Sequence, residues 1–138
     1  MATVAPAAPP AWFRIVALLA VLWNAYGVAM YLHSVGVWGD MTEVQRAATE
    51  SIPAAVKGAF AIGTFAGLLG SLGLLLRRRW AWPVLLVSLV ALLVLEGWIV
   101  FLSGMLDQFG LAVPVVVTLG ALLLAWLAWH ARQRGWLT

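Results

Sequence analysis

Long apolar stretches alternate with short polar connections along this chain, and the alternation predicts helices that cross a membrane. Each apolar stretch is close to the ~20 residues that an α-helix needs to span a hydrocarbon core of ~30 Å. Backbone N–H and C=O groups find no water inside hydrocarbon, so a spanning segment must satisfy them within itself as a helix. The stretches run over residues 12–33, 54–76, 81–102 and 111–130.

These stretches use up most of the chain, so we expect one membrane domain over residues 1–138. The expected fold is an all-α membrane protein, an antiparallel bundle of four transmembrane helices. Residues 1–11 form an Ala/Pro-rich arm whose prolines favour an extended conformation. The 34–53 connection is the longest polar region, and Thr42 and Gln45 have the spacing of a capping box. A short interfacial helix is therefore expected in this connection.

Composition supports a membrane protein and gives no sign of an enzyme. Hydrophobic residues make up 64% of the chain and charged residues 9%, whereas soluble domains carry about 25% charge. The chain has no cysteine, which excludes disulfides and thiolate sites. No metal-ligand triad and no nucleophile–base pair are evident, so we expect no catalysis, no metal and no cofactor. The net charge of +3 hides an asymmetry and does not indicate nucleic-acid binding.

Positive charge is concentrated in the connections on one side of the predicted bundle. That side carries six basic residues and no acid, and the opposite side carries two basic and four acidic residues. Because short basic loops stay in the cytoplasm, we expect both termini to be cytoplasmic in a bacterial inner membrane, with the 34–53 connection outside. The 77–79 turn can also bind anionic lipid headgroups. The six basic residues are Arg14, Arg77, Arg78, Arg79, Arg132 and Arg134.

The second apolar stretch carries small residues at every fourth position, and they predict close helix packing. Gly63, Gly67 and Ser71 fall on one face of a helix, where they let another backbone approach closely. One alternative is a dimerisation face of the Gly-xxx-Gly type, which is a weak signal by itself. The alternative that we favour is packing within the chain, against the first or the fourth stretch.

Glu96 is the most informative polar residue, because it lies inside the third stretch, roughly 9 Å from its outer end. An acid within hydrocarbon costs about 2.5 kcal/mol or more and indicates a function or a specific partner. If Lys57 pairs with Glu96, the two residues act as a structural clamp. If Lys57 extends to the interface instead, Glu96 exchanges a proton or a cation with the outside, or anchors a ligand. The sequence favours the clamp, since the chain has only one such acid.

Asn24, Gly27 and Tyr31 share one face of the first stretch, because they are three and seven residues apart. Asn24 and Tyr31 can hydrogen-bond to a neighbouring helix, and this packing role is the one that we favour. The sharper hypothesis is that Asn24, Tyr31 and Glu96 line one small cavity that opens to the outside.

The two histidines, His33 and His130, are predicted at opposite faces of the membrane. They cannot ligate one haem together within a single chain, and we expect both to be solvated at the interface. The alternative is that one of them is an axial ligand for a haem or pigment in a larger complex.

Several segments carry more information than their hydrophobicity alone. They are Pro-Pro-Ala-Trp-Phe (9–13), Trp23-Asn24-x-x-Gly27-x-x-x-Tyr31, Leu-Gly-Ser-Leu-Gly-Leu-Leu-Leu-Arg-Arg-Arg-Trp-Ala (69–81) and Arg-Gly-Trp-Leu (134–137). Together they resemble a family of small, mostly proteobacterial membrane proteins, often described as hypothetical proteins or as sugar transporters. The resemblance covers most of the chain and implies an inner-membrane location and a four-helix architecture. It brings no catalytic residues.

Two functions of different classes follow. We expect a non-catalytic integral membrane protein, an accessory or assembly subunit that packs in the bilayer against itself or against a larger complex. The alternative is a small oligomeric transporter or ligand-binding membrane protein that uses Glu96 in an outward-facing cavity. Transporters place their sites at repeat interfaces with broken helices, and the chain shows no convincing internal repeat, so this alternative comes second.

Overall fold

The computed structural model describes residues 8–138, apart from the side chains of residues 108 and 109, and its regular elements are helices. Most of the predicted 1–11 arm therefore lies outside the described residues. Four helices are long and apolar enough to cross a membrane, which confirms that part of the prediction. The long helices are α1 (Ala11–Ser34), α3 (Ala54–Leu75), α4 (Ala81–Phe101) and α6 (Ala112–Gln133), and the short ones are α2 (Glu43–Glu50) and α5 (Leu106–Phe109).

The polar connection after α1 contains a helix where the sequence predicts one. Helix α2 begins at a capping box: the Gln45 N–H donates to Thr42 Oγ1 at 3.3 Å, and the Thr42 N–H donates to Gln45 Oε1 at 2.9 Å. Helix α5, in contrast, lies in the short connection between the third and fourth predicted stretches, where the sequence predicts no helix. It is a single helical turn, too short for the periodicity of the sequence to reveal.

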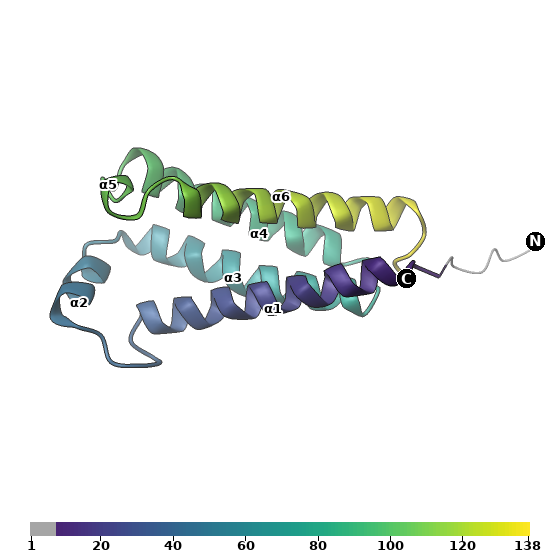
Figure 1. Cartoon of the computed structure of the whole chain (residues 1–138), viewed down its shortest axis with the longest axis horizontal. Helices are drawn as coiled ribbons and strands as arrows, with labels where there is room; N and C mark the ends of the chain where they lie inside the picture. The colour runs from purple at the N-terminus through teal and green to yellow at the C-terminus, as the bar shows by residue number, and fades with distance from the viewer. Residues whose placement is uncertain (1–7) are drawn as a thin grey trace, which may run out of the picture.

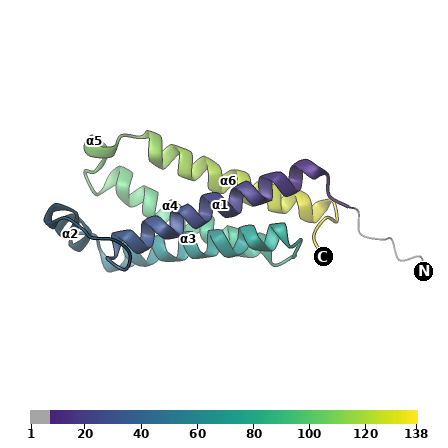
Figure 2. The same ribbon diagram turned by 60° about the horizontal axis from the view of Figure 1, so that its bottom comes forward.

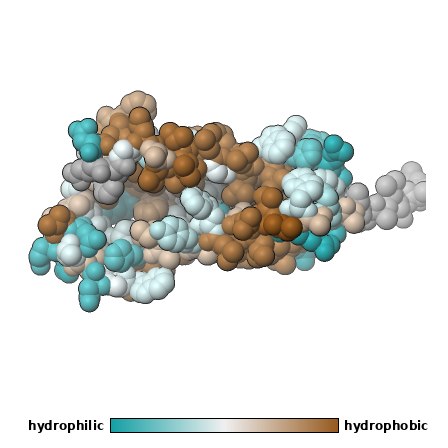
Figure 3. Space-filling view, in the orientation of Figure 1, coloured by the Kyte–Doolittle hydropathy of each residue, from teal (hydrophilic) through white to brown (hydrophobic). Residues whose placement is uncertain are grey.

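The long helices are antiparallel and lie in the spatial order α1, α3, α4, α6 (Figure 1). Helix α3 is the central and most buried one, because it packs against α1 on one side and α4 on the other. Helix α6 packs against α4. Helices α1 and α6 approach each other near the chain termini and diverge toward α2 and α5 (Figures 1 and 2). The surface between them is hollowed on that side (Figure 3).

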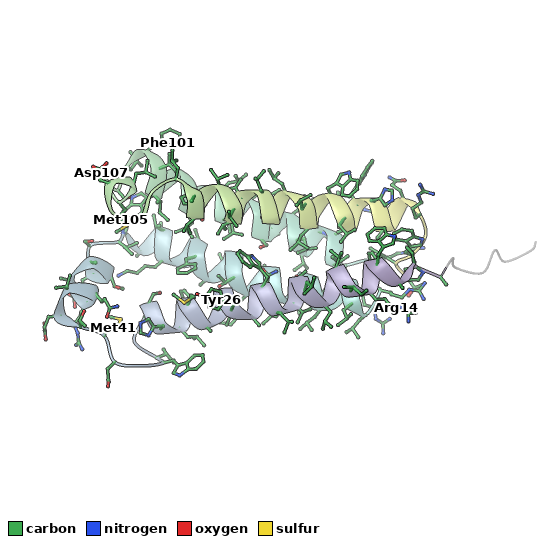
Figure 4. The ribbon with its side chains drawn as sticks, viewed as in Figure 1. Arg14, Tyr26, Met41, Phe101, Met105 and Asp107 are labelled. Atoms are coloured by element: carbon green, nitrogen blue, oxygen red, sulfur yellow. The ribbon has the colours of Figure 1, made fainter. Side chains whose placement is uncertain are left out.

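The two ends of the molecule differ in composition. We call the end with both described termini and Arg77–Arg79 the arginine end, and the end with α2 and α5 the loop end (Figure 1). Arg14 in Figure 4 lies at the arginine end, and Asp107 lies at the loop end. The charge asymmetry seen in the sequence is therefore an asymmetry between the two ends of the folded chain.

The turn after α3 is unusual, because a residue other than glycine occupies its left-handed position. Arg77 has φ 61°, a conformation for which glycine is the usual choice after a helix. The Arg77 N–H donates to Leu74 O at 3.0 Å, and the Arg78 N–H donates to Gly73 O at 2.7 Å. These two bonds satisfy carbonyls at the end of α3 that would otherwise lack a partner.

The C-terminal tail holds this turn in place, a contact that the sequence did not predict. The Thr138 N–H donates to Arg77 O at 2.6 Å, and the Arg79 N–H donates to Thr138 O at 3.2 Å. Arg77 Nε donates to Trp136 O at 2.8 Å, and Arg79 Nε donates to Leu137 O at 3.3 Å. The Leu137 side chain is buried in the core of this end. Two of the three arginines predicted to bind lipid headgroups thus also bind the tail.

The face of α3 that packs on α4 is made of glycines. A methyl group at Gly63 would lie 2.8 Å from the Leu92 side chain, and one at Gly70 would lie 2.6 Å from that of Leu85. Such distances are too short for real contacts, so the absence of a side chain is what lets α4 approach. The ridge predicted from Gly63 is therefore covered within the chain. At Gly63, however, the covering helix is α4, the third stretch, and not the first or the fourth stretch that the sequence favoured.

Candidate functional site

Asn24 ties α1 to α3 in the middle of the bundle. Its Nδ2 donates to Ala20 O in its own helix at 2.9 Å and to Ser71 Oγ at 3.0 Å. Ser71 in turn donates to Gly67 O at 2.7 Å. Both side chains are buried, and the Asn24 amide fills the space that a side chain at Gly67 would occupy. Two of the three residues predicted for packing, Gly67 and Ser71, thus contact Asn24, which was predicted for the site.

A second polar contact ties α4 to the same part of α3. Ser88 is buried and donates its hydroxyl proton to Gly63 O at 2.6 Å. A small cavity of about 20 Å³ lies next to Ser88 and Asn24, between α1, α4 and α6. This volume accommodates one water molecule, which both polar side chains could bind. Hydrogen bonds of polar side chains therefore join α1, α3 and α4 in the middle of the bundle.

Tyr31 belongs to the contact between α1 and α3. Its ring packs edge-on against Phe60 at 5.3 Å and against Phe65 at 5.9 Å, measured between ring centroids. Asn24 lies about 10 Å deeper along α1, since seven residues separate the two at about 1.5 Å each. The single cavity predicted for Asn24, Tyr31 and Glu96 stays a hypothesis: the small cavity is lined by Asn24 but not by the other two.

Glu96 continues the face of α4 that packs on α3. Leu92 lies against Gly63, and four residues further along each antiparallel helix come Glu96 and Ala59, both buried. Only 7% of the Glu96 surface is exposed. Within the described part of the chain, its Oε2 atom accepts no hydrogen bond. A buried carboxyl oxygen without a partner costs free energy, so the packing of α4 on α3 does not by itself explain an acid at this position.

Lys57 lies on another side of α3. It is two residues from Ala59, which corresponds to about 200° around a helix, so the two side chains leave α3 in nearly opposite directions. Lys57 lines a cavity at the loop end, between α2 and the adjoining ends of α1 and α3. The clamp predicted between Lys57 and Glu96 therefore does not account for the unpartnered Oε2 atom.

The loop-end cavity has a volume of about 500 Å³ and opens to the surface. Its lining includes Met41, which Figure 4 shows between α2 and the end of α1. Four charged side chains line it, two of each sign: Asp40, Arg46, Glu50 and Lys57. Sequence reasoning assigned no site here; the only available signal was the charge content of the 34–53 connection.

Both histidines have structural contacts. The His33 Nδ1 atom lies 2.9 Å from Trp38 O, a hydrogen bond that closes the loop after α1. The His130 ring stacks on Trp126 and meets the edge of Trp136. Among the described residues, no group of three or more His, Asp or Glu side chains could hold a metal ion.

No family model, no curated protein and no solved structure matches this chain. The resemblance to a family of small four-helix membrane proteins therefore stays a prediction.

Proposed function

We propose that this chain is a non-catalytic, multi-pass protein of a bacterial inner membrane. In this proposal it acts as an accessory or assembly subunit that packs against a second copy or against a larger membrane complex. The observation that carries the proposal is an uncovered aromatic pair, Trp23 and Tyr26, in the middle part of α1. Trp23 is 48% exposed and Tyr26 is 62% exposed.

The position of this pair, midway along a membrane-spanning helix, favours contact with a protein partner over contact with lipid. Trp23 lies at the midpoint of α1 (Ala11–Ser34), far from either interface, where tryptophan and tyrosine are normally enriched. The Tyr26 hydroxyl forms no hydrogen bond within the described chain, and lipid tails cannot supply one. Figure 4 shows Tyr26 on α1 between the two ends of the helix. The hollow between α1 and α6 gives a partner helix a place to pack (Figure 3).

A photo-reactive aromatic residue in place of Tyr26 is expected to cross-link to one product of defined mass in native membranes. The mass identifies either two copies of the chain or the chain with one partner. The matched control is the same residue in place of Leu93, which is also exposed and is also eight residues from the loop end of its helix. Adducts with lipid alone at both positions would contradict the proposal.

The orientation is a separate part of the proposal, supported by the positive charge of the arginine end. Ser51→Cys, beside α2, is expected to react with an impermeant thiol reagent added to intact cells, and Gln133→Cys is expected to react only after lysis. Both residues are exposed, and the chain has no cysteine of its own to interfere. The reverse pattern of labelling would place both termini outside.

A second function is supported by the unpartnered oxygen of Glu96. A buried acid that is not tied to the chain can bind a proton, a cation or a cationic ligand. In reconstituted vesicles, proton-coupled flux that Glu96→Gln abolishes and Ser88→Ala retains would establish a transporter. Equal flux through both variants would dissociate Glu96 from transport.

A further inference from the structure

The loop-end cavity is lined by four charged side chains that form no ion pair within the described chain. Asp40, Arg46, Glu50 and Lys57 come from the loop, from α2 and from α3, and they line one space of about 500 Å³. This volume falls within the range of ligand pockets, about 300–1,000 Å³. Although two are basic and two are acidic, no ion pair joins them within residues 8–138. The Thr49 and Ser34 side chains add hydroxyl groups to the lining.

The charge pattern selects the class of ligand. Two cations and two carboxylates give the lining no net charge, so neither a simple anion nor a simple cation satisfies all four groups. A zwitterion does, because its anionic group can take hydrogen bonds from Arg46 and Lys57 while its cationic group donates to Asp40 and Glu50.

The position of the cavity indicates that the zwitterion is a lipid headgroup. It lies where α1 and α3 end, and its lining includes Gly36 and Gly39 of the loop after α1. Between these glycines, Val37 and Trp38 are exposed apolar side chains, which belong at the membrane interface. The cavity is therefore at headgroup depth whichever way the protein is inserted.

We propose that the loop-end cavity binds the headgroup of a zwitterionic phospholipid, with the phosphate at Arg46 and Lys57 and the ammonium at Asp40 and Glu50. The cationic group is a primary ammonium of the ethanolamine class. Its N–H groups can donate to carboxylates, whereas a quaternary choline has no N–H and prefers aromatic cages. Among the described residues, those that line the cavity include no aromatic side chain.

The test is competitive lipid retention, measured by native mass spectrometry of the purified protein in detergent. Phosphatidylethanolamine, phosphatidylcholine and phosphatidylglycerol with identical acyl chains are supplied in equal amounts. We expect about tenfold more ethanolamine lipid than choline lipid to be retained. Glu50→Gln removes a carboxylate that is proposed to bind the ammonium, so it should remove this preference. Arg46→Gln removes a phosphate contact that all three lipids share, so it should lower their retention together without changing the preference, while Arg46→Lys should keep most of the retention.

Two charge-matched controls accompany these variants. Glu43→Gln changes an acid of the same helix that does not line the cavity, and Arg134→Gln changes a cation at the arginine end; neither should alter the preference. Equal retention of the three lipids by the unmodified protein would overturn the proposal, whether or not the variants fold. Displacement of the lipid by equimolar glycerophosphoethanolamine would also overturn it, since the ligand would then be a free solute.

The inference requires that the four long helices are inserted in a membrane, but it does not depend on a partner at Tyr26. Failure of the cross-linking experiment would therefore leave the lipid preference unaffected, and loss of the lipid preference would leave the cross-linking result unaffected.

Discussion

Gly67→Ala is expected to destabilise the detergent-solubilised protein by about 1–3 kcal/mol, because the added methyl group has no room. It would collide with the amide oxygen of Asn24 and lie 3.1 Å from Ser88 Oγ. The amide cannot simply turn away, since its nitrogen is held by Ala20 O and by Ser71 Oγ. The free energy of unfolding can be measured by titration with a denaturing detergent, followed by circular dichroism.

Two other helical glycines provide matched controls. Gly58 in α3 and Gly97 in α4 have no atom within 4 Å of the position that a methyl group would take. Alanine at either position should leave the stability unchanged or raise it by about 0.5–1 kcal/mol, because alanine restricts the unfolded chain more than glycine does. A loss at Gly58 as large as the loss at Gly67 would mean that glycine acts through helix flexibility and not through packing.

A double substitution separates the collision from other effects. Asn24→Ala alone removes the hydrogen bond to Ser71 and should cost about 0.6 kcal/mol, the typical value for an interhelical bond in a membrane protein. It also vacates the space beside Gly67. The double variant with Gly67→Ala should therefore be more stable than the sum of the two losses predicts. If the two stability losses simply add, Asn24 is not the group that excludes a methyl group at residue 67.

The sequence predicts those features that depend on residues close together in the chain. Four apolar stretches of the right length become α1, α3, α4 and α6 because each helix satisfies its own backbone. The spacing of Gly63, Gly67 and Ser71 likewise predicts a smooth helix face, because it depends only on residues close together in one helix. The partner of that face cannot be predicted in this way, because the register that places Gly63 against Leu92 is set by two helices together.

Contacts between distant segments account for what the sequence misses. The sequence predicts no contact for the last residues, yet Leu137 is buried and Thr138 pairs with Arg77, 61 residues away. The loop-end cavity is built from charges of the loop, α2 and α3, each of which resembles an ordinary exposed residue by itself. Local patterns do not encode which of these segments meet.

Glu96→Gln is expected to leave the free energy of unfolding unchanged or to raise it, and Glu96→Leu is expected to raise it by about 1–2 kcal/mol. The reason is that Oε2 is buried without a hydrogen-bond donor, so the carboxylate loses hydration and receives no bond in return. The comparison is Ser88→Ala on the same helix, which removes a hydroxyl that does have a partner, Gly63 O at 2.6 Å. That variant should lose stability. Two buried polar residues of α4 should thus respond to substitution with opposite signs.

Lys57→Met completes the experiment, because it tests the clamp directly. If Lys57 stabilised Glu96, the Glu96→Gln variant would be destabilised by more than about 1 kcal/mol, and adding Lys57→Met would restore much of the loss. With Lys57 directed to the loop-end cavity, we expect no such rescue. A protein that gains stability when its buried acid is removed retains that acid for another reason, such as a bound cation or a partner helix. The same denaturation, repeated with the partner or the cation present, should then show the stability gain of Glu96→Leu disappear.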